Sequence, residues 1–269
     1  MTSACPGCQD GKTFKTDFTM AFQPIVDVVA GEVWAYEALV RGPDGDPAGS
    51  VLQSVTPETL YAFDQACRVK AIKLAGARMP KGSRARLSIN FLPNAVYEPR
   101  ACIRASLAAA AKANFDPSRL MFEFTENERI DDVDHVENII REYHKMGFTV
   151  AIDDFGAGHS GLVLLARFRP DVLKLDMDLI RDIDTSHSKQ AIVAGVAAIA
   201  RSLEIDLLAE GVETKAELGC LRAAGIRLFQ GWLFGEPAVE RFEEVDFAAL
   251  GLPQHSEDEH AEVTSRIRA

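Results

Sequence analysis

The chain has 269 residues, of which 47% are hydrophobic and 26% are charged, and its formal net charge at pH 7 is −11. These proportions are typical of a soluble globular protein with a large core, and the acidic balance argues against a DNA- or RNA-binding protein, which needs a basic surface. The sequence has no apolar run long enough to cross a membrane and no signal peptide, so we expect a cytoplasmic protein with no membrane partner.

The chain begins with a predicted extension, residues 1–16, which contains the pair Cys5 and Cys8. The five cysteines of the chain are an odd number without secretory context, so reduced thiols are expected. A C-x-x-C pair is half of a zinc site or a redox pair, but no second pair follows. We favour an incidental pair, and a metal or redox site stays open as the alternative.

A main domain is predicted over residues 17–250, followed by a polar tail at residues 251–269. It begins with two apolar segments, residues 20–28 and 33–40, joined by only four residues. So short a link forms a hairpin and not a parallel crossover. The first strand should therefore run antiparallel to the second.

The rest of the domain alternates between strand-like and helical segments. Six further strands are predicted at residues 86–92, 120–126, 149–152 with the two aspartates that follow, 171–176, 205–210 and 226–230. Helices are predicted at residues 58–78, 94–114, 133–146, 160–167, 188–203 and 215–224. Eight strands in this alternation predict an α/β fold, a TIM-like (β/α)8 barrel whose first strand is antiparallel to the others.

Polar residues stand at the ends of these strands, where a barrel of this type carries its functional groups. They are Glu37, Asn90, Glu123, Asp153, Asp154, Lys174, Asp176, Glu210 and Gln230. Asp153 and Asp154 are the most informative, because adjacent carboxylates repel each other unless cations lie between them. A bridging aspartate suits two divalent ions, although a solvated Asp-Asp turn is the simpler alternative for the pair alone.

Lys174 has two interpretations. It could pair with Asp176 in a purely structural role, or it could orient and stabilise a charged reactant. Since the many acids around it favour its charged form, it is a poor candidate for a free-amine base.

Six segments carry a resemblance to a known family. They are Tyr36-Glu-Ala-Leu-Val-Arg41, Phe122-Glu-Phe-Thr-Glu126, Ile152-Asp-Asp-Phe-Gly156, Leu173-Lys-Leu-Asp176, Ala209-Glu-Gly-Val-Glu-Thr214 and Phe229-Gln-Gly-Trp-Leu-Phe-Gly235. In this order and spacing they resemble the EAL domain family. The residues of several segments are most similar to those of EAL domains linked to light-sensing BLUF modules. The resemblance implies a phosphodiesterase that hydrolyses cyclic di-GMP to linear 5′-pGpG by two-metal activation of water.

The resemblance also implies a role for each residue. Implied metal ligands are Glu37, Asn90, Glu123, Asp153, Asp154 and Glu210, with Asp153 bridging. Implied catalytic residues are Glu37, Asp153, Lys174 and Glu213, of which Glu213 would position Lys174. Substrate contacts are implied for Gln23, Leu39, Arg41, Asp176 and Gln230, and anchoring of the loop after Asp154 for Thr125 and Glu126.

The implied ligands are all oxygen donors, which suits two Mg²⁺ or Mn²⁺ ions, and we expect Ca²⁺ to inhibit because its longer bonds place water poorly. The resemblance implies a homodimer, and a regulatory partner remains unidentified. His159 follows the aspartates closely but is not assigned a role.

Two other functions remain open at this point. A catalytically weak or inactive EAL domain would act as a cyclic di-GMP receptor or a protein-interaction module. An enolase-type barrel would abstract a proton beside a carboxylate, but the antiparallel hairpin and the Asp-Asp pair argue against it.

Overall fold

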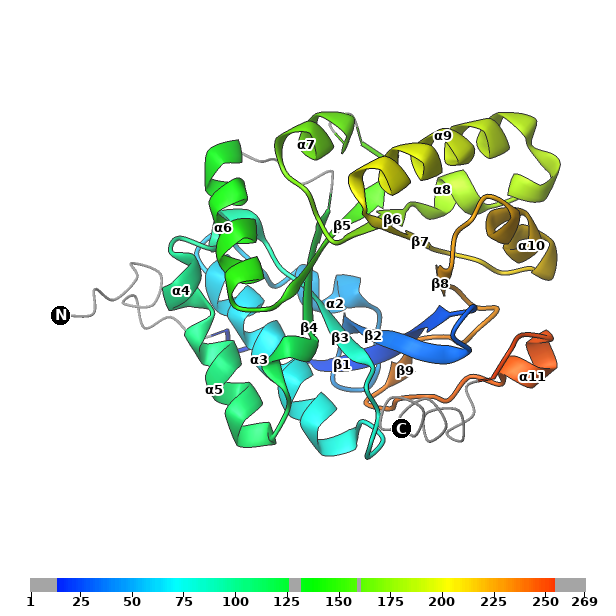
Figure 1. The fold of residues 1–269 in the computed structure, drawn as a ribbon. Helices are drawn as coiled ribbons and strands as arrows, with labels where there is room; N and C mark the ends of the chain where they lie inside the picture. Colours follow the sequence, from blue (N-terminus) through cyan, green and yellow to red (C-terminus); the bar gives the residue numbers. More distant parts are fainter. Residues whose placement is uncertain (1–13, 126–131, 159–160, 255–269) are drawn as a thin grey trace, which may run out of the picture.

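The computed structural model describes residues 14–125, 132–158 and 161–254 (Figure 1). Its strands are β1 (Thr19–Asp27), β2 (Glu32–Arg41), β3 (Arg86–Asn90), β4 (Leu120–Thr125), β5 (Thr149–Phe155), β6 (Val172–Leu175), β7 (Asp206–Ala209), β8 (Leu228–Gln230) and β9 (Ala238–Val239). Strands β2 to β8 are parallel neighbours in chain order, and β1 closes the barrel by pairing antiparallel with both β8 and β2. The predicted α/β barrel with an antiparallel first strand is confirmed.

Helices surround the barrel (Figure 1). The α-helices are α2 (Ala48–Leu52), α3 (Leu60–Arg78), α4 (Pro99–Cys102), α5 (Arg104–Ala113), α6 (Val133–Lys145), α7 (Gly161–Arg167), α8 (Met177–Ile180), α9 (His187–Leu203), α10 (Lys215–Ala223) and α11 (Phe247–Leu250). Three short 3-10 helices are η1 (Pro93–Ala95), η2 (Pro117–Arg119) and η3 (Ile183–Thr185). No helix in the described ranges combines the length and the apolar character needed to cross a membrane.

The single helix predicted at residues 94–114 is wrong, because this stretch folds as η1, α4 and α5. The residue before a proline is pushed out of the helical region, and Glu98 accordingly has an extended backbone before Pro99. The Glu98 carboxylate then accepts hydrogen bonds from the Arg100 and Ala101 amides and starts a new helix. The short elements α2, α8, α11 and β9 were also not predicted, since two to five residues carry too little periodicity.

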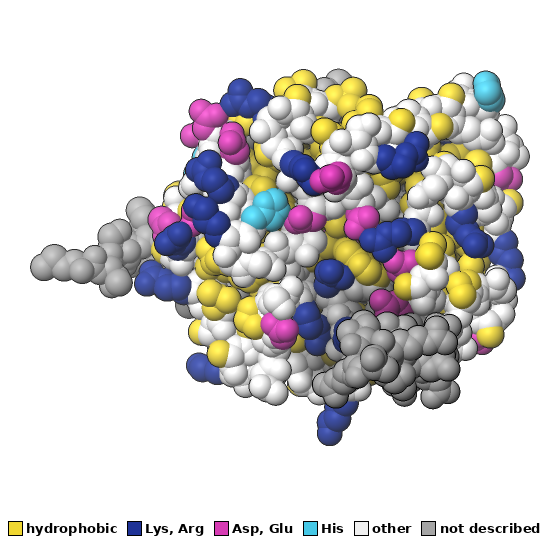
Figure 2. Space-filling view, in the orientation of Figure 1, with side chains coloured by type: hydrophobic (Ala, Val, Ile, Leu, Met, Phe, Trp, Pro, Cys, Tyr) yellow, Lys and Arg dark blue, Asp and Glu magenta, His cyan; other side chains and the backbone are white. Residues whose placement is uncertain are grey.

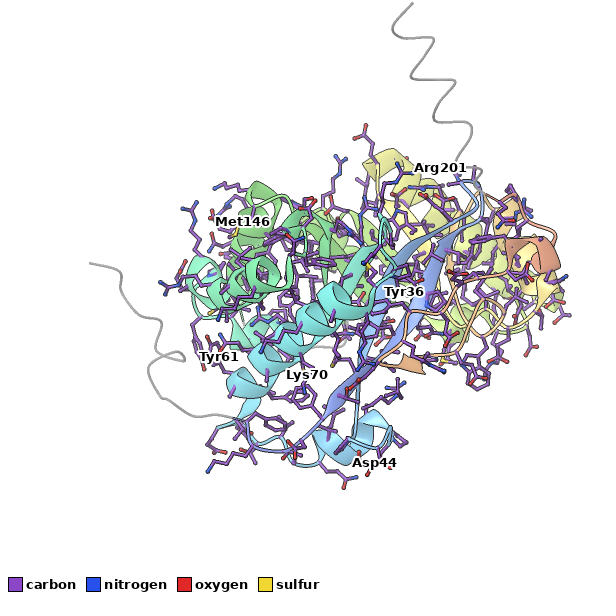
Figure 3. All side chains as sticks on the ribbon, turned by 90° about the horizontal axis from the view of Figure 1, so that it is seen from below. Tyr36, Asp44, Tyr61, Lys70, Met146 and Arg201 are labelled. Atoms are coloured by element: carbon purple, nitrogen blue, oxygen red, sulfur yellow. The ribbon has the colours of Figure 1, made fainter. Side chains whose placement is uncertain are left out.

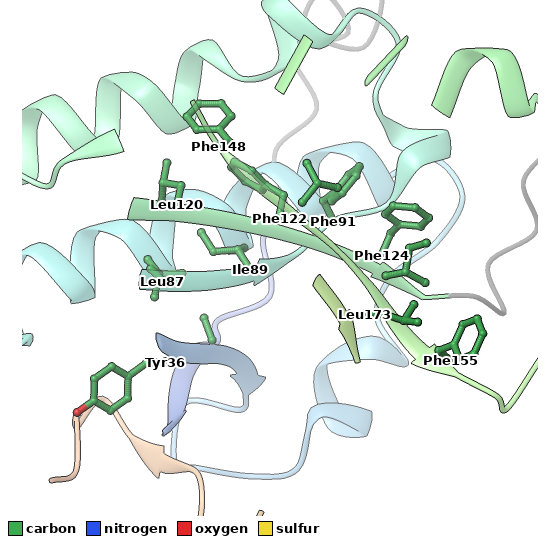
Figure 4. Close-up of a cluster of buried hydrophobic side chains, with 14 of the residues drawn as sticks. Tyr36, Leu87, Ile89, Phe91, Leu120, Phe122, Phe124, Phe148, Phe155 and Leu173 are labelled. Atoms are coloured by element: carbon green, nitrogen blue, oxygen red, sulfur yellow. The ribbon is translucent and has the colours of Figure 1, made fainter. Parts of the chain in front are cut away.

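Successive side chains of each strand point alternately out of and into the barrel, which gives the protein two separate apolar cores. Side chains pointing outward pack under the helices, as Phe91, Phe122, Phe124 and Phe148 do in Figure 4. Side chains pointing inward form a smaller cluster inside the barrel. Its members are Ile25, Trp34, Ala35, Met121, Ala151, Val172, Leu208 and Leu228.

Helix α3 packs along the opening hairpin, as the view from below shows (Figure 3). The ammonium of Lys70 lies 5.3 Å from the centre of the Phe18 ring. The Phe14 ring, which belongs to the predicted extension, lies 4.9 Å from that of Phe63 on α3. The described end of that extension therefore packs against the main domain.

Candidate metal centre at the carboxyl end of the barrel

A layer of polar side chains lies inside the barrel, next to its interior apolar cluster and closer to the carboxyl ends of the parallel strands. Successive side chains of a strand point to opposite faces, so a residue two positions after an inward-facing residue also faces inward. Met121 is followed in this way by Glu123, and Ala151 by Asp153. The same step from Ala35, Val172, Leu208 and Leu228 leads to Glu37, Lys174, Glu210 and Gln230.

Lys174 is the centre of this layer and is completely buried. Its Nζ lies 2.7 Å from a carboxylate oxygen of Glu210 and 3.1 Å from oxygens of both Glu123 and Asp153. The Glu37 carboxylate follows at 3.7 Å. One cation thus faces four carboxylates, which leaves a local excess of negative charge.

Burial and mutual repulsion change the pKa values of these groups. Burial alone would lower the pKa of Lys174, but the carboxylates around it, led by Asp153 and Glu123, raise it well above its ordinary value. Lys174 is therefore an ammonium ion. Burial raises the pKa of Glu123 and of Glu210 well above the ordinary range, and neighbouring carboxylates add to the effect against the opposing field of Lys174.

Glu37 differs from these two carboxylates. Burial would raise its pKa, but Lys174 and a hydrogen bond from Gln230 act in the opposite direction, so the net change is a lowered pKa. The Gln230 Nε2 donates to Glu37 Oε2 at 2.6 Å. Asn90 Nδ2 lies between Glu37 and Glu123, at 3.2 and 3.1 Å from their oxygens. Of the three glutamates around Lys174, Glu37 is accordingly the one whose anionic form is favoured.

Asp153 and Asp154 both line the site because the strand is irregular there. In a regular strand, adjacent side chains point to opposite faces. The pairing of β5 with β6 shifts between Ile152 and Phe155, and Asp154 has a left-handed φ of 55°. A bulge of this kind re-aims a side chain, so two consecutive carboxylates are presented at one site. β5 includes both aspartates and ends at Phe155, one residue beyond the predicted segment.

The carboxylates fall into two groups that share Asp153. In each group, one oxygen from every residue lies within 4.8 Å of the others. The first group contains Glu37, Glu123 and Asp153, and the second contains Asp153, Asp154 and Glu210. Oxygen donors of this type fit hard divalent cations, and a shared carboxylate fits a pair of them.

Two cavities open beside this centre. The acidic cavity has a volume of about 410 Å³. It is lined by Gln23, Glu37, Leu39, Asp153, Asp154, Asp176, Met177, Arg181, Glu210, Gly211, Glu213, Gln230, Gly231 and Trp232. The second cavity, of about 510 Å³, is mainly apolar. Leu39 lines both cavities and so lies between them.

The structure brings most of the predicted substrate-contacting residues to the acidic cavity, but not Arg41. Arg41 lines the apolar cavity together with Asn90 and Thr125, and its Nη1 donates to the Val40 carbonyl at 2.8 Å. Asp176 lines the acidic cavity and also caps α8 by accepting a hydrogen bond from the Asp178 amide. Gln23 accepts from Gln230 at 3.0 Å.

Among the described residues, no ion pair joins Glu213 to Lys174, and the positioning role implied for Glu213 stays a prediction. Its carboxylate pairs with Arg181 at 2.9 Å, at the edge of the acidic cavity. Glu126, His159, Cys5 and Cys8 lie outside the described residues.

Two polar residues of the site were not predicted from the sequence. Ser88 is fully buried and donates from Oγ to Glu123 Oε2 at 2.7 Å, which orients that carboxylate. The signal was its position two residues before Asn90, on the same face of β3. Arg181 is the C-cap residue of α8 and lines the acidic cavity. No sequence motif indicated this position.

Comparisons with known proteins agree with this geometry. The EAL domain family model matches residues 12–237. A standalone EAL protein from Vibrio cholerae O395, solved with cyclic di-GMP bound, superposes with a TM-score of 0.83 at 48% identity, covering 87% of this chain and 98% of that one. Klebsiella pneumoniae BlrP1, solved with manganese and cyclic di-GMP, gives a TM-score of 0.78 at 38% identity, covering 85% of this chain and 58% of that one.

Among curated proteins, the blue light- and temperature-regulated antirepressor BluF of Escherichia coli is 37% identical over 218 residues, which span 80% of this chain and 53% of BluF. The chain thus corresponds to about half of that relative. This match confirms the predicted likeness to EAL domains of light-regulated proteins. With its barrel, its six motifs and its shared-aspartate centre, this chain belongs to the EAL domain family.

Proposed function

We propose that this chain is a phosphodiesterase that hydrolyses cyclic di-GMP to linear 5′-pGpG with two divalent cations, Mg²⁺ or Mn²⁺. The observation that carries the proposal is the pair of carboxylate groups sharing Asp153 beside the buried Lys174. Two relatives solved with bound cyclic di-GMP support the substrate.

The proposed metal ligands are the two carboxylate groups together with Asn90, whose side chain already lies between Glu37 and Glu123. When bound, two such cations lower the pKa of water and neutralise the phosphate oxygens. Without them the excess of carboxylates would repel the anionic substrate.

The chain's own residues complete the reaction. Lys174 is an ammonium ion beside Asp153, so it donates hydrogen bonds and stabilises negative charge on the attacked phosphate. Asp153, in both carboxylate groups, accepts the proton of the attacking water. A bond forms from the water oxygen to phosphorus and the bond to the 3′ oxygen breaks. The proton that Asp153 accepted passes to the 3′ oxygen, which leaves a 5′-phosphate and a 3′-hydroxyl.

The remaining predicted roles concern placement of the substrate. Gln23, Leu39, Asp176 and Gln230 line the acidic cavity and would contact the substrate there. Arg41 would meet a phosphate oxygen only from the side of the apolar cavity. Thr125, paired in register with Asp153, would hold the following loop.

A homodimer is part of the proposal. Exposed hydrophobic side chains occur on α7 (Leu162 and Val163) and on α9 (Ile192 and Ile199). Figure 2 shows hydrophobic side chains along the upper edge of the molecule, over these helices. Light scattering at several protein concentrations, with Leu162→Asp as the disrupting variant, tests this: a dimer that persists in the variant contradicts the proposed interface.

A second function has an observation in its favour. BluF, 37% identical to this chain, is named an antirepressor. The alternative is a catalytically weak or inactive domain that acts as a cyclic di-GMP receptor or a protein-interaction module.

The test is hydrolysis of cyclic di-GMP by the purified protein with Mg²⁺, Mn²⁺ or Ca²⁺, beside Glu37→Ala and a metal-free sample. Formation of pGpG that disappears in both controls supports the phosphodiesterase, and we expect Ca²⁺ to inhibit. Tight binding without turnover under Mg²⁺ and Mn²⁺ would favour the receptor instead.

A further inference from the structure

Trp232 has an exposed ring at the edge of the acidic cavity. Trp232 is 63% exposed as a residue, and Met177 and Arg181 line the same cavity. Single exposed hydrophobic residues are common on protein surfaces. This one differs because it shares a cavity with Asp153 and Glu210 of the candidate metal centre.

The backbone that carries Trp232 is fixed on both sides. The Val212 amide donates to the Gln230 carbonyl at 3.1 Å, and the Leu233 amide donates to the Val212 carbonyl at 3.1 Å. A Cβ on Gly231 would lie 2.1 Å from the Val212 carbonyl oxygen, so only glycine permits this approach. The ring is thus presented to the cavity from a rigid support, which lowers the entropy lost when a ligand packs on it.

Two other residues that line this cavity are also held in place. Arg181 pairs with Glu213 at 2.9 Å. Met177 lies against Gly211 so closely that a Cβ on that glycine would be 2.6 Å from the Met177 Cβ. The lining of this acidic cavity therefore also includes an aromatic ring, a thioether and a guanidinium group.

We propose that Trp232 stacks on one guanine base of cyclic di-GMP and so determines that this site takes dinucleotides in preference to other phosphodiesters. The inference rests on the proposed phosphodiesterase function. Carboxylates near the centre attract cations and repel phosphate, so a contact with the uncharged base is the means by which this edge of the cavity adds affinity. Because every base has a π-face, stacking separates nucleotides from simple diesters but does not separate guanine from adenine.

The first test is steady-state hydrolysis of cyclic di-GMP by Trp232→Ala and Trp232→Phe. Losing one stacked base is expected to raise KM about 5- to 150-fold, with a smaller change in kcat, and phenylalanine should restore most of the affinity. Val29→Ala is the matched control, since Val29 is 70% exposed in the hairpin turn at the opposite end of the barrel. An unchanged KM in Trp232→Ala would overturn the inference and leave the phosphodiesterase intact.

The second test uses the fluorescence of tryptophan, because the chain contains only two, Trp34 and Trp232. Trp34 is 8% exposed and lies inside the barrel. Binding of pGpG with Mn²⁺, followed in parallel by calorimetry, should quench the wild-type protein, and the quench should be lost in Trp232→Phe although pGpG still binds. An equal quench in this variant would overturn the inference.

A wild-type protein that neither binds nor hydrolyses cyclic di-GMP would overturn the proposed function, and the inference with it. A Trp232→Ala variant that changes oligomeric state but keeps its KM would assign the ring to a protein interface and also overturn the inference. The two failures are thus distinguishable.

Discussion

The two ends of the barrel differ in how their charged side chains are paired. At the amino end, Arg227 pairs with both Asp27 and Asp206, the latter at 2.8 Å, and the Arg86 guanidinium lies 4.5 Å from the centre of the Trp34 ring. Each of these charged side chains has a partner within the protein. These contacts close the end of the interior apolar cluster.

At the carboxyl end, Lys174 is the single cation within 4.0 Å of the four described carboxylates that surround it. The excess negative charge must be met by protons or by ions from solution. An unbalanced, buried set of charges thus marks the functional end of the barrel, whereas a paired set marks the structural end.

The largest expected effect comes from removing the carboxylate common to both groups. Asp153→Asn should lower the rate of cyclic di-GMP hydrolysis at least ~100-fold, because it removes charge from both metal sites at once. Hydrolysis assays together with Mn²⁺ titration calorimetry measure this. Asp206→Asn at the amino end is the control and should leave both quantities unchanged; full activity in Asp153→Asn would contradict the two-metal centre.

The next effect is stabilisation by metal. If the carboxyl end needs cations, adding Mn²⁺ at 100 times its Kd should raise the free energy of unfolding by about 2.7 kcal/mol for one site. Urea unfolding with and without Mn²⁺ gives the difference. Asp153→Asn should lose this gain. If Mn²⁺ did not change the free energy of unfolding of the wild-type protein, the excess negative charge would be neutralised by something other than this cation.

A change at the amino end should affect stability alone. Arg227→Met leaves the buried Asp27 without its cation, although Asp27 still accepts hydrogen bonds from the Val29 and Ala30 amides. The expected cost is about 1–3 kcal/mol in the free energy of unfolding. Chemical denaturation measures it, and Mn²⁺ affinity serves as the second readout. A weakened affinity would show that the two ends are coupled.

The smallest effect is a pH dependence of the metal-free protein. Burial, with the carboxylates of Asp153 and Asp176, raises the pKa of Asp154 to about 6, from 3.8. Between these values the folded protein holds a proton that the unfolded chain has released, so stability should fall as pH rises through this window. Partial exposure of Asp154 to water weakens the effect.

Unfolding in the presence of a chelator at several pH values between 4 and 7 tests this expectation. Asp154→Asn should give a flatter profile because it removes the titrating group. The raised pKa values of Glu123 and Glu210 act in the same direction and remain in this variant. Identical profiles for the two proteins would place the titration elsewhere.

The barrel could be predicted because its signals are repeated. Alternating strands and helices recur along the main domain, and the four-residue link before β2 allowed only an antiparallel start. The polar layer also follows from the sequence, since Glu123 and Asp153 each come two residues after an apolar residue that faces inward. Both features depend on local periodicity, which a sequence shows directly.

Other features depend on contacts that no local pattern shows. Pro99 divides the predicted helix at residues 94–114 into separate pieces, and the bulge at Asp153 and Asp154 arises from the pairing of β5 with β6. The partner of Glu213 depends on the short helix α8, which brings Arg181 to it. These outcomes required the tertiary structure.

The left-handed backbone of Asp154 has a consequence for attempts to make the protein more heat-resistant. A residue with a Cβ in this conformation costs ~1 kcal/mol relative to glycine, so Asp154→Gly would relieve the strain and remove a carboxylate from a crowded acidic site. A selection for thermal tolerance alone would therefore favour the loss of Asp154 and enrich variants without activity. Screens for robust forms of this protein should retain a demand for turnover at every round.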